Sequence, residues 1–163
     1  MGSNTKLQLQ FTDRPWYANG SNGSSYADTG YQSTWEVTRA QASTTGILNN
    51  YTGAEAATAL IDADPSAAAR TFLTQIEPVL PGITARWNGK ATLDAWVGNK
   101  WAKGSYSYYR VGQNTAFGGA ESEREGNAHF AGEHTTQEWQ GWLQGAVFTG
   151  QRAVKEILTD LKD

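Results

Sequence analysis

The segment HFAGEHTTQEWQGWLQGAVFTGQRAVKEI, from His129 to Ile157, constrains the fold of this chain more than any other stretch. At its start, Gly126–Gly132 is short, apolar and bounded by glycines, which predicts a buried strand. From Gln140 to about Lys162, apolar residues recur at the spacing of one helical face: Trp142, Ala146, Ala153, Ile157 and Leu161. The sequence therefore predicts a buried strand, a polar loop and a long helix, in that order.

Three glycines, Gly141, Gly145 and Gly150, lie in the first half of this predicted helix. Each costs about 1 kcal/mol relative to alanine in a helix interior. A neighbouring segment that presses against the helix backbone explains such glycines, so we expect close packing there.

The N-terminus of the predicted helix suits a ligand that carries or develops negative charge, because its first N–H groups are unpaired and partly positive. Trp142 in the first turn could form one wall of a pocket, and Glu133 on the preceding loop could accept hydrogen bonds from sugar hydroxyls. The residues alone are equally compatible with a purely structural role, in which the helix packs on a sheet and Glu133 is in solvent.

The remainder of the chain mixes strand and helix patterns. Lys6–Phe11 alternates apolar and polar residues, as a half-buried strand does. The other predicted strands are Ser33–Ala40, Gly46–Thr52 and Ile83–Asn88, and the other predicted helices are Ala54–Ile61 and Ser66–Leu80, the latter after Pro65. Residues 17–32 and 98–119 are rich in glycine and polar residues and predict loops.

Composition excludes several classes of function. The net charge of −3 and the pI of about 5.4 give no basic surface for nucleic acid. No apolar run approaches the roughly 20 residues of a membrane span, and no signal peptide is visible, so we expect no membrane partner and a cytoplasmic location by default. The absence of cysteine excludes disulfides and a cofactor held by a Cys thioether, and only two histidines argue against a metal centre.

The terminal segment resembles the C-terminal FAD-contacting segment of the flavin-containing amine oxidases, the monoamine and polyamine oxidase family. The shared pattern is F-A-G-E-H-T, then G-aromatic-x-x-G-A, then a small residue, G and R-A. The resemblance implies that Glu133 contacts the ribityl–phosphate region of FAD. It also implies that the Leu143 N–H faces the flavin pyrimidine edge, where the helix dipole stabilises negative charge. Gly132, Trp142 and Ala146 belong to the same implied cofactor surface.

The stretch KGSYSYYRVGQ, Lys103–Gln113, resembles the family segment that carries one of two aromatic residues flanking the substrate nitrogen. The matching pair is Tyr106 and Trp142, whose ring faces would attract an amine. Ser105 stands where some members carry a Cys bonded to the flavin, so the implied FAD is noncovalent. A Trp at the second aromatic position also occurs in L-amino-acid oxidases, which leaves that class open, with Arg110 as the nearest candidate for a carboxylate-binding arginine.

Upstream, MGSNTKLQLQF resembles the family strand in which a Lys holds a water against flavin N5, and Lys6 is the matching residue. Without the resemblance, a Lys at this position reads as a solvated strand end. Trp96, nine residues before Ser105, matches a Trp near the flavin ring more weakly. The segments FTDRPW, STWEVTRA and WNGKATLDAW fit the substrate-domain sheet of bacterial members.

The resemblance implies an α+β fold. Residues 1–100 correspond to part of the substrate-binding domain, with a mixed or antiparallel sheet and helices, and residues 101–163 to the C-terminal strand–helix segment of an FAD-binding α/β domain. The family's G-x-G-x-x-G unit for the cofactor pyrophosphate is not found, since GSNGSS at Gly20–Ser25 lacks the spacing. We therefore expect only the C-terminal portion of such an enzyme, with the N-terminal dinucleotide-binding half absent.

The implied activity is oxidative deamination of a small-molecule amine, with hydride transfer to flavin and reduction of O2 to H2O2. The implied partner is an N-terminal complementing chain or segment. We expect the chain alone neither to hold FAD tightly nor to turn over, and its last helix to expose apolar surface around Trp142 and Phe148. The alternative is a non-catalytic remnant or interaction module without cofactor.

Overall fold

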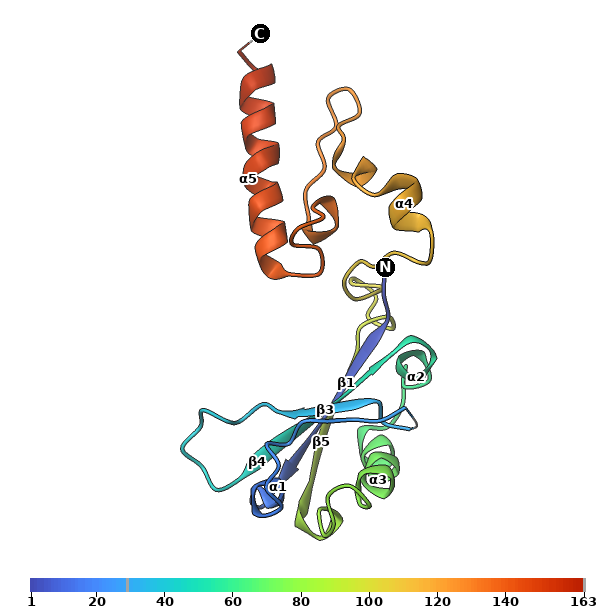
Figure 1. Ribbon diagram of the computed structural model, residues 1–163, viewed down its shortest axis with the longest axis vertical. Coiled ribbons are helices and arrows are strands. Elements are labelled where there is room, and N and C mark those ends of the chain that lie inside the picture. Colours follow the sequence, from blue (N-terminus) through green and yellow to red (C-terminus); the bar gives the residue numbers. More distant parts are fainter. Residues whose placement is uncertain (29, 163) are drawn as a thin grey trace. The chain divides into compact units, whose positions relative to one another are not determined.

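The computed structural model describes residues 1–28 and 30–162, which form two compact units (Figure 1). Ser3–Gly104 forms the first, here called the sheet unit. Met1–Gly2 and the chain from Ser105 onward form the second, here called the terminal unit. Each unit is described by itself.

The sheet unit is built on five antiparallel strands in the order β2-β3-β4-β1-β5. Strand β1, between β4 and β5, pairs with β4 along its whole length, from Asn4 opposite Gly53 to Phe11 opposite Gly46. The strands are β1 Asn4–Phe11, β2 Ser25–Tyr26, β3 Ser33–Glu36, β4 Gly46–Gly53 and β5 Trp87–Ala95. The predicted α+β class with an antiparallel sheet and helices is confirmed.

Helix α3, Pro65–Ile76, covers one face of the sheet (Figure 1). It begins where the sequence predicts, because Asp64 accepts a hydrogen bond from the Ala67 N–H at 2.8 Å and Pro65 occupies the first turn. It ends before Pro78, which has no N–H to continue the helix. The shorter helices of this unit are α1 Pro15–Ala18 and α2 Ala54–Thr58.

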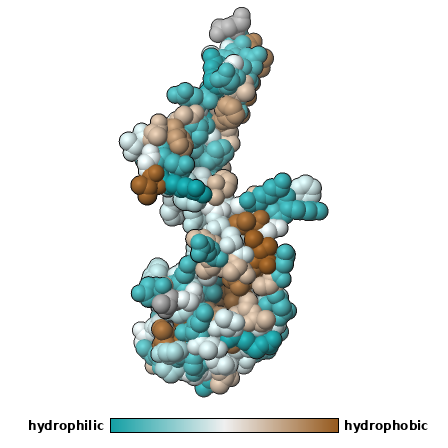
Figure 2. Space-filling model, turned by 90° about the vertical axis from the view of Figure 1, so that its right-hand side faces the viewer, coloured by the Kyte–Doolittle hydropathy of each residue, from teal (hydrophilic) through white to brown (hydrophobic). Residues whose placement is uncertain are grey.

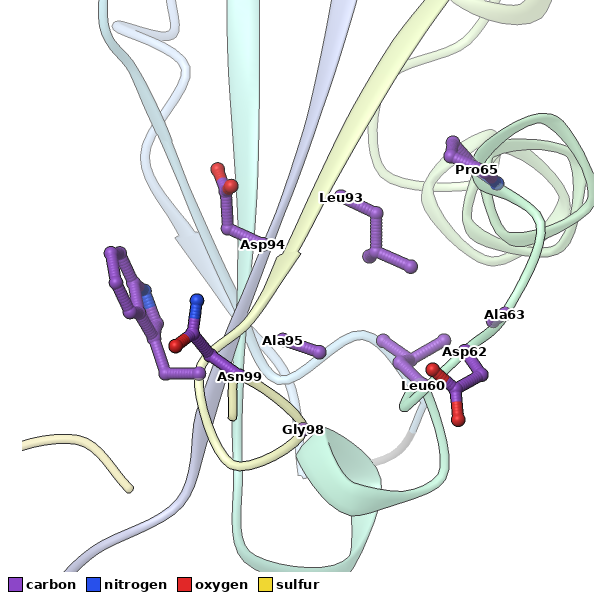
Figure 3. Close-up of a pocket in the computed structure, with 10 residues that line it drawn as sticks. Leu60, Asp62, Ala63, Pro65, Leu93, Asp94, Ala95, Gly98 and Asn99 are labelled. Atoms are coloured by element: carbon purple, nitrogen blue, oxygen red, sulfur yellow. The ribbon is translucent and has the colours of Figure 1, made fainter. Parts of the chain in front are cut away.

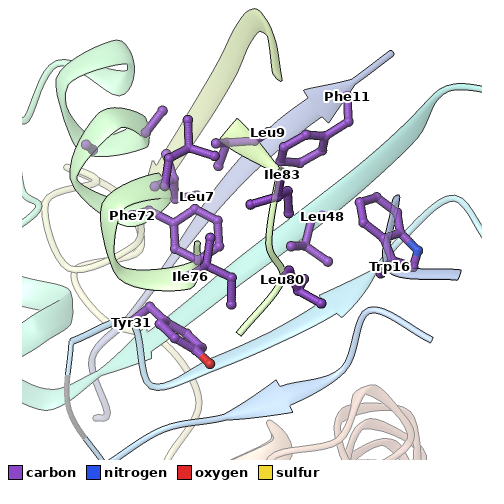
Figure 4. Close-up of a cluster of buried hydrophobic side chains, with 13 residues drawn as sticks. Leu7, Leu9, Phe11, Trp16, Tyr31, Leu48, Phe72, Ile76, Leu80 and Ile83 are labelled. Carbon is purple, nitrogen blue, oxygen red and sulfur yellow. The ribbon is translucent and has the colours of Figure 1, made fainter. Parts of the chain in front are cut away.

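The core lies between α3 and the apolar face of β1. Leu7, Leu9 and Phe11 alternate onto that face and are buried, as the alternating pattern predicts (Figure 4). Their partners in the cluster include Trp16, Leu48, Phe72, Ile76, Leu80 and Ile83. Each buried side chain of this size contributes about 1.5–3 kcal/mol, so this cluster is the main source of stability in the unit.

A buried carboxylate fixes the segment after β1 to the end of β3. Glu36 accepts hydrogen bonds from Trp16 Nε1 at 3.0 Å, the Tyr17 hydroxyl at 2.6 Å and the Thr38 hydroxyl at 2.8 Å, and it lies 2.8 Å from Arg14 Nε. Burial raises the pKa of Glu36, but these hydrogen bonds and the Arg14 charge outweigh burial and hold the pKa below its usual value. Glu36 is therefore a charged structural anchor.

Two predictions for the sheet unit are corrected. Ile83–Asn88 is not a strand throughout, because the Arg86 N–H bonds to the Ile83 carbonyl at 3.0 Å and closes the 3₁₀ turn η1, Thr84–Arg86. The strand β5 starts only at Trp87, which pairs with Phe11. The strand predicted at Ser33–Ala40 ends at Glu36, where the chain turns through Thr38.

The terminal unit is dominated by helix α5, Leu143–Asp160, preceded by short turns (Figure 1). These turns are α4 Gln113–Phe117, η2 Ala120–Ser122 and η3 Glu133–Thr135. The long helix is confirmed in type, although it begins three residues later than Gln140. Within the described residues, none of the helices combines the length and apolar character needed to cross a bilayer.

The predicted strand at Gly126–Gly132 is wrong. This segment forms only an isolated bridge between Glu125 and Ala128, and the Phe130 side chain is 44% exposed. A strand needs neighbouring strands to pair its backbone groups, and all strands of the described residues belong to the sheet unit. The segment is apolar enough for a strand but has no sheet here to join.

Candidate functional site

Two of the predicted site residues, Tyr106 and Trp142, line one hollow in the terminal unit. The hollow has a volume of about 370 Å³, and its wall is formed by Tyr106, Ser107, Tyr108, Tyr109, Gln140, Gly141 and Trp142. Tyr106 is 46% exposed and Trp142 is 67% exposed, so both rings offer surface to a ligand. A hollow of this size with aromatic walls suits a small, flat or cationic molecule.

The Tyr106 backbone is fixed by the first residues of the chain. The Gly2 N–H donates to the Tyr106 carbonyl at 2.8 Å, and the Ser105 N–H donates to the Gly2 carbonyl at 2.8 Å. A Cβ on Gly2 would lie 3.0 Å from both the Ser105 hydroxyl oxygen and the Tyr106 carbonyl oxygen. Glycine therefore permits this close pairing.

Tyr109, on the same loop, is held as a hydrogen-bond donor. Its hydroxyl donates to the Glu121 carboxylate, and this hydrogen bond raises the pKa of the Tyr109 phenol. The Glu121 carboxylate also accepts a hydrogen bond from the Gly119 N–H at 2.9 Å. Tyr109 therefore remains a neutral phenol in the wall of the hollow.

Trp142 stands at the N-terminus of α5 in extended conformation, and no side chain caps the helix. Leu143, the first helical residue, is 90% exposed. The first N–H groups of a helix have no helical acceptor and carry partial positive charge. An uncapped and exposed helix start of this kind can stabilise a ligand group that carries or develops negative charge.

Glu133 lies in the turn η3 and is engaged by protein donors. Its Oε1 accepts from the Ser107 N–H at 2.9 Å, and its Oε2 accepts from the Ser107 hydroxyl at 2.9 Å and the Gly141 N–H at 2.6 Å. Glu133 is partly exposed, and both of its carboxylate oxygens accept hydrogen bonds from the protein. The contact with FAD implied by the resemblance stays a prediction.

Two residues of α5, Thr149 and Arg152, are not among the predicted site residues. In the motif, Thr149 is the small residue before G, and Arg152 is the R of R-A. The Gly132 N–H donates to the Thr149 hydroxyl at 2.9 Å. Arg152 donates to the carbonyls of Phe130 at 2.7 Å and Thr135 at 3.0 Å. Together they attach both ends of the Glu133 turn to the helix.

The three glycines of the terminal segment have three different explanations. A Cβ on Gly145 would lie 2.4 Å from the Trp139 carbonyl oxygen, so the predicted close neighbour is confirmed there. Gly141 lies outside the helix with φ of +82°, a conformation that favours glycine. Gly150 has nothing within 4 Å of an added Cβ, so the prediction is wrong at this position.

Lys6 and Trp96 lie in the sheet unit. Lys6 on β1 is opposite Tyr51 on β4 and Asp94 on β5, on the sheet face away from Leu7. Trp96 follows β5 and lines a separate hollow of about 350 Å³, together with residues such as Leu60, Asp62, Leu93 and Asn99 (Figure 3). Tyr106, Gly132, Glu133, Trp142, Leu143 and Ala146 all lie in the terminal unit, and Ala146 is exposed on α5.

Comparison with known proteins gives one consistent family. The family model for flavin containing amine oxidoreductases matches residues 1–158. An amine oxidase [flavin-containing] of Danio rerio is 38% identical over 64 residues, which cover 39% of this chain and 12% of that protein. A pseudooxynicotine dehydrogenase of Pseudomonas sp is 30% identical over 105 residues, which cover 63% of this chain and 20% of that protein.

Solved structures agree on the fold. Cyclohexylamine oxidase from Brevibacterium oxydans IH-35A matches with a TM-score of 0.84 at 24% identity, over all of this chain and 36% of that chain. A redesigned putrescine oxidase matches with a TM-score of 0.82 at 22% identity, over 98% of this chain and 36% of that chain. This chain thus spans about a third of the solved structures and an eighth to a fifth of these curated relatives. Since the family model covers nearly its whole length, the chain belongs to the flavin containing amine oxidoreductase family.

Proposed function

We propose that this chain forms one side of the active site of an FAD-dependent amine oxidase that oxidises a small-molecule amine. One observation carries the proposal. Tyr106 and Trp142 line the same hollow, and that hollow adjoins the uncapped N-terminus of α5. The proposed amine site and the proposed flavin-facing helix start therefore lie next to each other, at Trp142.

The role of Tyr106 and Trp142 is to bind and orient the amine. Their ring faces carry partial negative charge and attract a cationic nitrogen or its polarised N–H groups. The hollow of about 370 Å³ has room for a small amine. No acid or base from this chain is required if the amine binds in its neutral form.

The proposed FAD is noncovalent, because Ser105 supplies a hydroxyl where the covalent link of some family members needs a cysteine. The Leu143 N–H, Gly132, Ala146 and Glu133 are the groups of the terminal unit that would hold it. The chemistry that FAD supplies is acceptance of a hydride from the carbon beside the amine nitrogen, with return of the electrons to O2 as H2O2.

Lys6 is proposed to hold a water molecule by its ammonium group. The residue lies on the polar face of β1, and the Lys6 side chain makes no salt bridge within the described residues. A lysine without a carboxylate partner keeps its N–H donors available for water. That water would assist imine hydrolysis or the reaction with O2.

The proposed partner is the N-terminal dinucleotide-binding segment of the same enzyme class. Helix α5 exposes a row of large apolar side chains: Leu143, Val147, Phe148, Val154, Ile157, Leu158 and Leu161. In the upper part of Figure 2, which contains α5, tan and brown apolar side chains lie among teal polar ones. Apolar surface of this extent is typical of a surface that another segment covers.

An L-amino-acid oxidase is the second candidate. Trp142 at the second aromatic position favours it, and Arg110 lies exposed on the Tyr106 loop, where a substrate carboxylate could be bound. A panel of simple amines and L-amino acids distinguishes the two, because only the second class should require the substrate carboxylate and lose activity in Arg110→Ala.

The test is an FAD titration of the purified chain, alone and with an N-terminal family segment that carries G-x-G-x-x-G. Only the complemented sample should bind flavin and release H2O2 when an amine is added. A complemented sample that binds flavin but never reacts with any amine or amino acid contradicts the proposed activity. A yellow, amine-reducible protein formed by this chain alone contradicts the need for a partner.

A further inference from the structure

The Glu133 carboxylate connects the two backbone segments that carry the rings of the hollow. Ser107, which donates to Oε1 and Oε2, directly follows Tyr106, and Gly141, which donates to Oε2, directly precedes Trp142. Tyr106 and Trp142 are 36 positions apart in the chain, yet one carboxylate binds the residue adjacent to each. A displacement of this carboxylate therefore displaces both sides of the hollow.

The carboxylate is itself fixed to the longest helix of the unit. The turn Glu133–Thr135 is attached on one side through Gly132 to Thr149 and on the other through Thr135 to Arg152. Both anchors lie within α5, which runs for 18 residues. Through these contacts, Glu133 holds the loop of Tyr106 in a fixed position relative to α5.

The Trp142 side of the hollow needs such an anchor. Gly141, directly before Trp142, has φ of +82°. Glycine has more backbone conformational freedom than any other residue, so the backbone at this position needs an external contact to fix it. Hydrogen bonds to an ionised carboxylate are about twice as strong as neutral ones. A second and weaker bridge, from Gln140 Nε2 to the Ser107 hydroxyl at 3.0 Å, spans the same two segments.

We propose that Glu133 is a positioning residue that sets the separation of the Tyr106 and Trp142 rings, through its hydrogen bonds to Ser107 and Gly141. This inference rests on the proposed amine site and is distinct from any contact of Glu133 with the cofactor. Its consequence is that Glu133 determines how well an amine fits between the rings.

Glu133→Gln is the decisive variant because it keeps the shape of the side chain. Oε1 faces the Ser107 N–H and Oε2 faces the Gly141 N–H, so the NH2 of a glutamine faces a backbone donor in either orientation. One of the two backbone hydrogen bonds, from the Ser107 N–H or from the Gly141 N–H, must therefore break. Glu138→Gln is the matched control, because Glu138 is exposed in the same loop and loses the same charge.

The first measurement needs neither cofactor nor activity. Amide hydrogen exchange of the full chain, followed by NMR, should show faster exchange at Ser107 or Gly141 in Glu133→Gln, by about tenfold or more for one lost charge-assisted bond. Glu138→Gln should match the wild type, and unchanged exchange in α5, Leu143–Asp160, shows that the terminal unit of Glu133→Gln still folds. Equal exchange at Ser107 and Gly141 in all three proteins overturns the proposal.

The second measurement uses the complemented, flavin-loaded protein. Measured at saturating FAD, Glu133→Gln should raise the KM for the amine about tenfold, with a smaller change in kcat. Weaker FAD binding with an unchanged amine KM overturns the positioning role and assigns Glu133 to the cofactor. If the wild type oxidises no amine, the proposed function fails, and the exchange measurement alone then decides whether Glu133 bridges the segments.

Discussion

The two units of the molecule bury apolar surface to very different extents. Among the described residues, every buried apolar side chain except Ala153 lies in the sheet unit. Helix α5 of the terminal unit is as long as many core helices, yet it leaves Leu143, Leu158 and Leu161 exposed. The sheet unit therefore carries its own core, whereas the terminal unit is held mainly by polar contacts and leaves the apolar side chains of α5 exposed.

The two units also differ in how deeply their multiply hydrogen-bonded carboxylates, Glu36 and Glu133, are buried. Glu36 in the sheet unit is buried and is held by Arg14 and three hydrogen-bond donors. Glu133 in the terminal unit is partly exposed, and its proposed role is to position the Tyr106 and Trp142 rings.

The largest expected effect is the loss of the buried anchor in the sheet unit. Glu36→Gln leaves Arg14 without its buried partner and should lower the free energy of unfolding by about 3–5 kcal/mol. Because the folded pKa of Glu36 is below its unfolded value, its contribution is complete above the unfolded pKa and is lost as the pH falls through the folded pKa. Urea unfolding across acidic pH should show this loss in the wild type and a flatter profile in Glu36→Gln; parallel profiles contradict the assignment.

The next effect compares the same substitution in the two units. Leu9→Ala removes a side chain that is 0% exposed and should cost about 2–5 kcal/mol. Leu158→Ala removes one that is 53% exposed and should change the stability of the chain alone by less than about 0.5 kcal/mol. Urea unfolding of each variant gives the comparison, and similar losses for both would show that α5 has a core of its own.

A smaller pair of effects lies within α5. Gly145→Ala puts a Cβ 2.4 Å from the Trp139 carbonyl oxygen, and the resulting displacement should cost about 1–3 kcal/mol. Gly150→Ala meets no atom within 4 Å and should instead stabilise the helix by up to about 1 kcal/mol. Amide exchange in α5 reports both changes, and the same sign for the two variants would contradict this account of the glycines.

The smallest effect on stability is expected at Lys6. Lys6→Met should leave the free energy of unfolding within about 0.5 kcal/mol of the wild type, since the side chain lies on the polar face of β1. In the complemented enzyme it should slow imine hydrolysis or flavin reoxidation, because the water loses its donor. Stopped-flow rates that are unchanged for both steps remove Lys6 from the mechanism.

Local patterns predicted the elements that depend on local chemistry. β1 follows from the alternation of Leu7, Leu9 and Phe11, and α3 follows from Asp64 and Pro65 at its start. The failures occur where structure depends on distant partners. Gly126–Gly132 has the composition of a strand but has no sheet to join. Gly141 lies outside α5, which begins at Leu143, and its N–H donates to Glu133, eight residues earlier in the chain.

The site was predictable in residue type but not in its internal connections. The motif resemblance picks out Tyr106, Glu133 and Trp142, and the structure places all three in one unit. The hydrogen bonds from Ser107 and Gly141 to Glu133 could not be predicted, because they depend on how two loops close around one turn. Spacing in a single sequence carries no signal for that closure.

The central claim is that Tyr106 and Trp142 form the amine-binding side of a flavin site. The most direct test is the rate at which an amine reduces bound flavin without oxygen in the complemented protein, for the wild type, Tyr106→Ala and Trp142→Ala. The account predicts rapid reduction in the wild type and at least about tenfold slower reduction at limiting amine in each variant, as expected for loss of one ring face. Reduction of equal rate in all three proteins would contradict it.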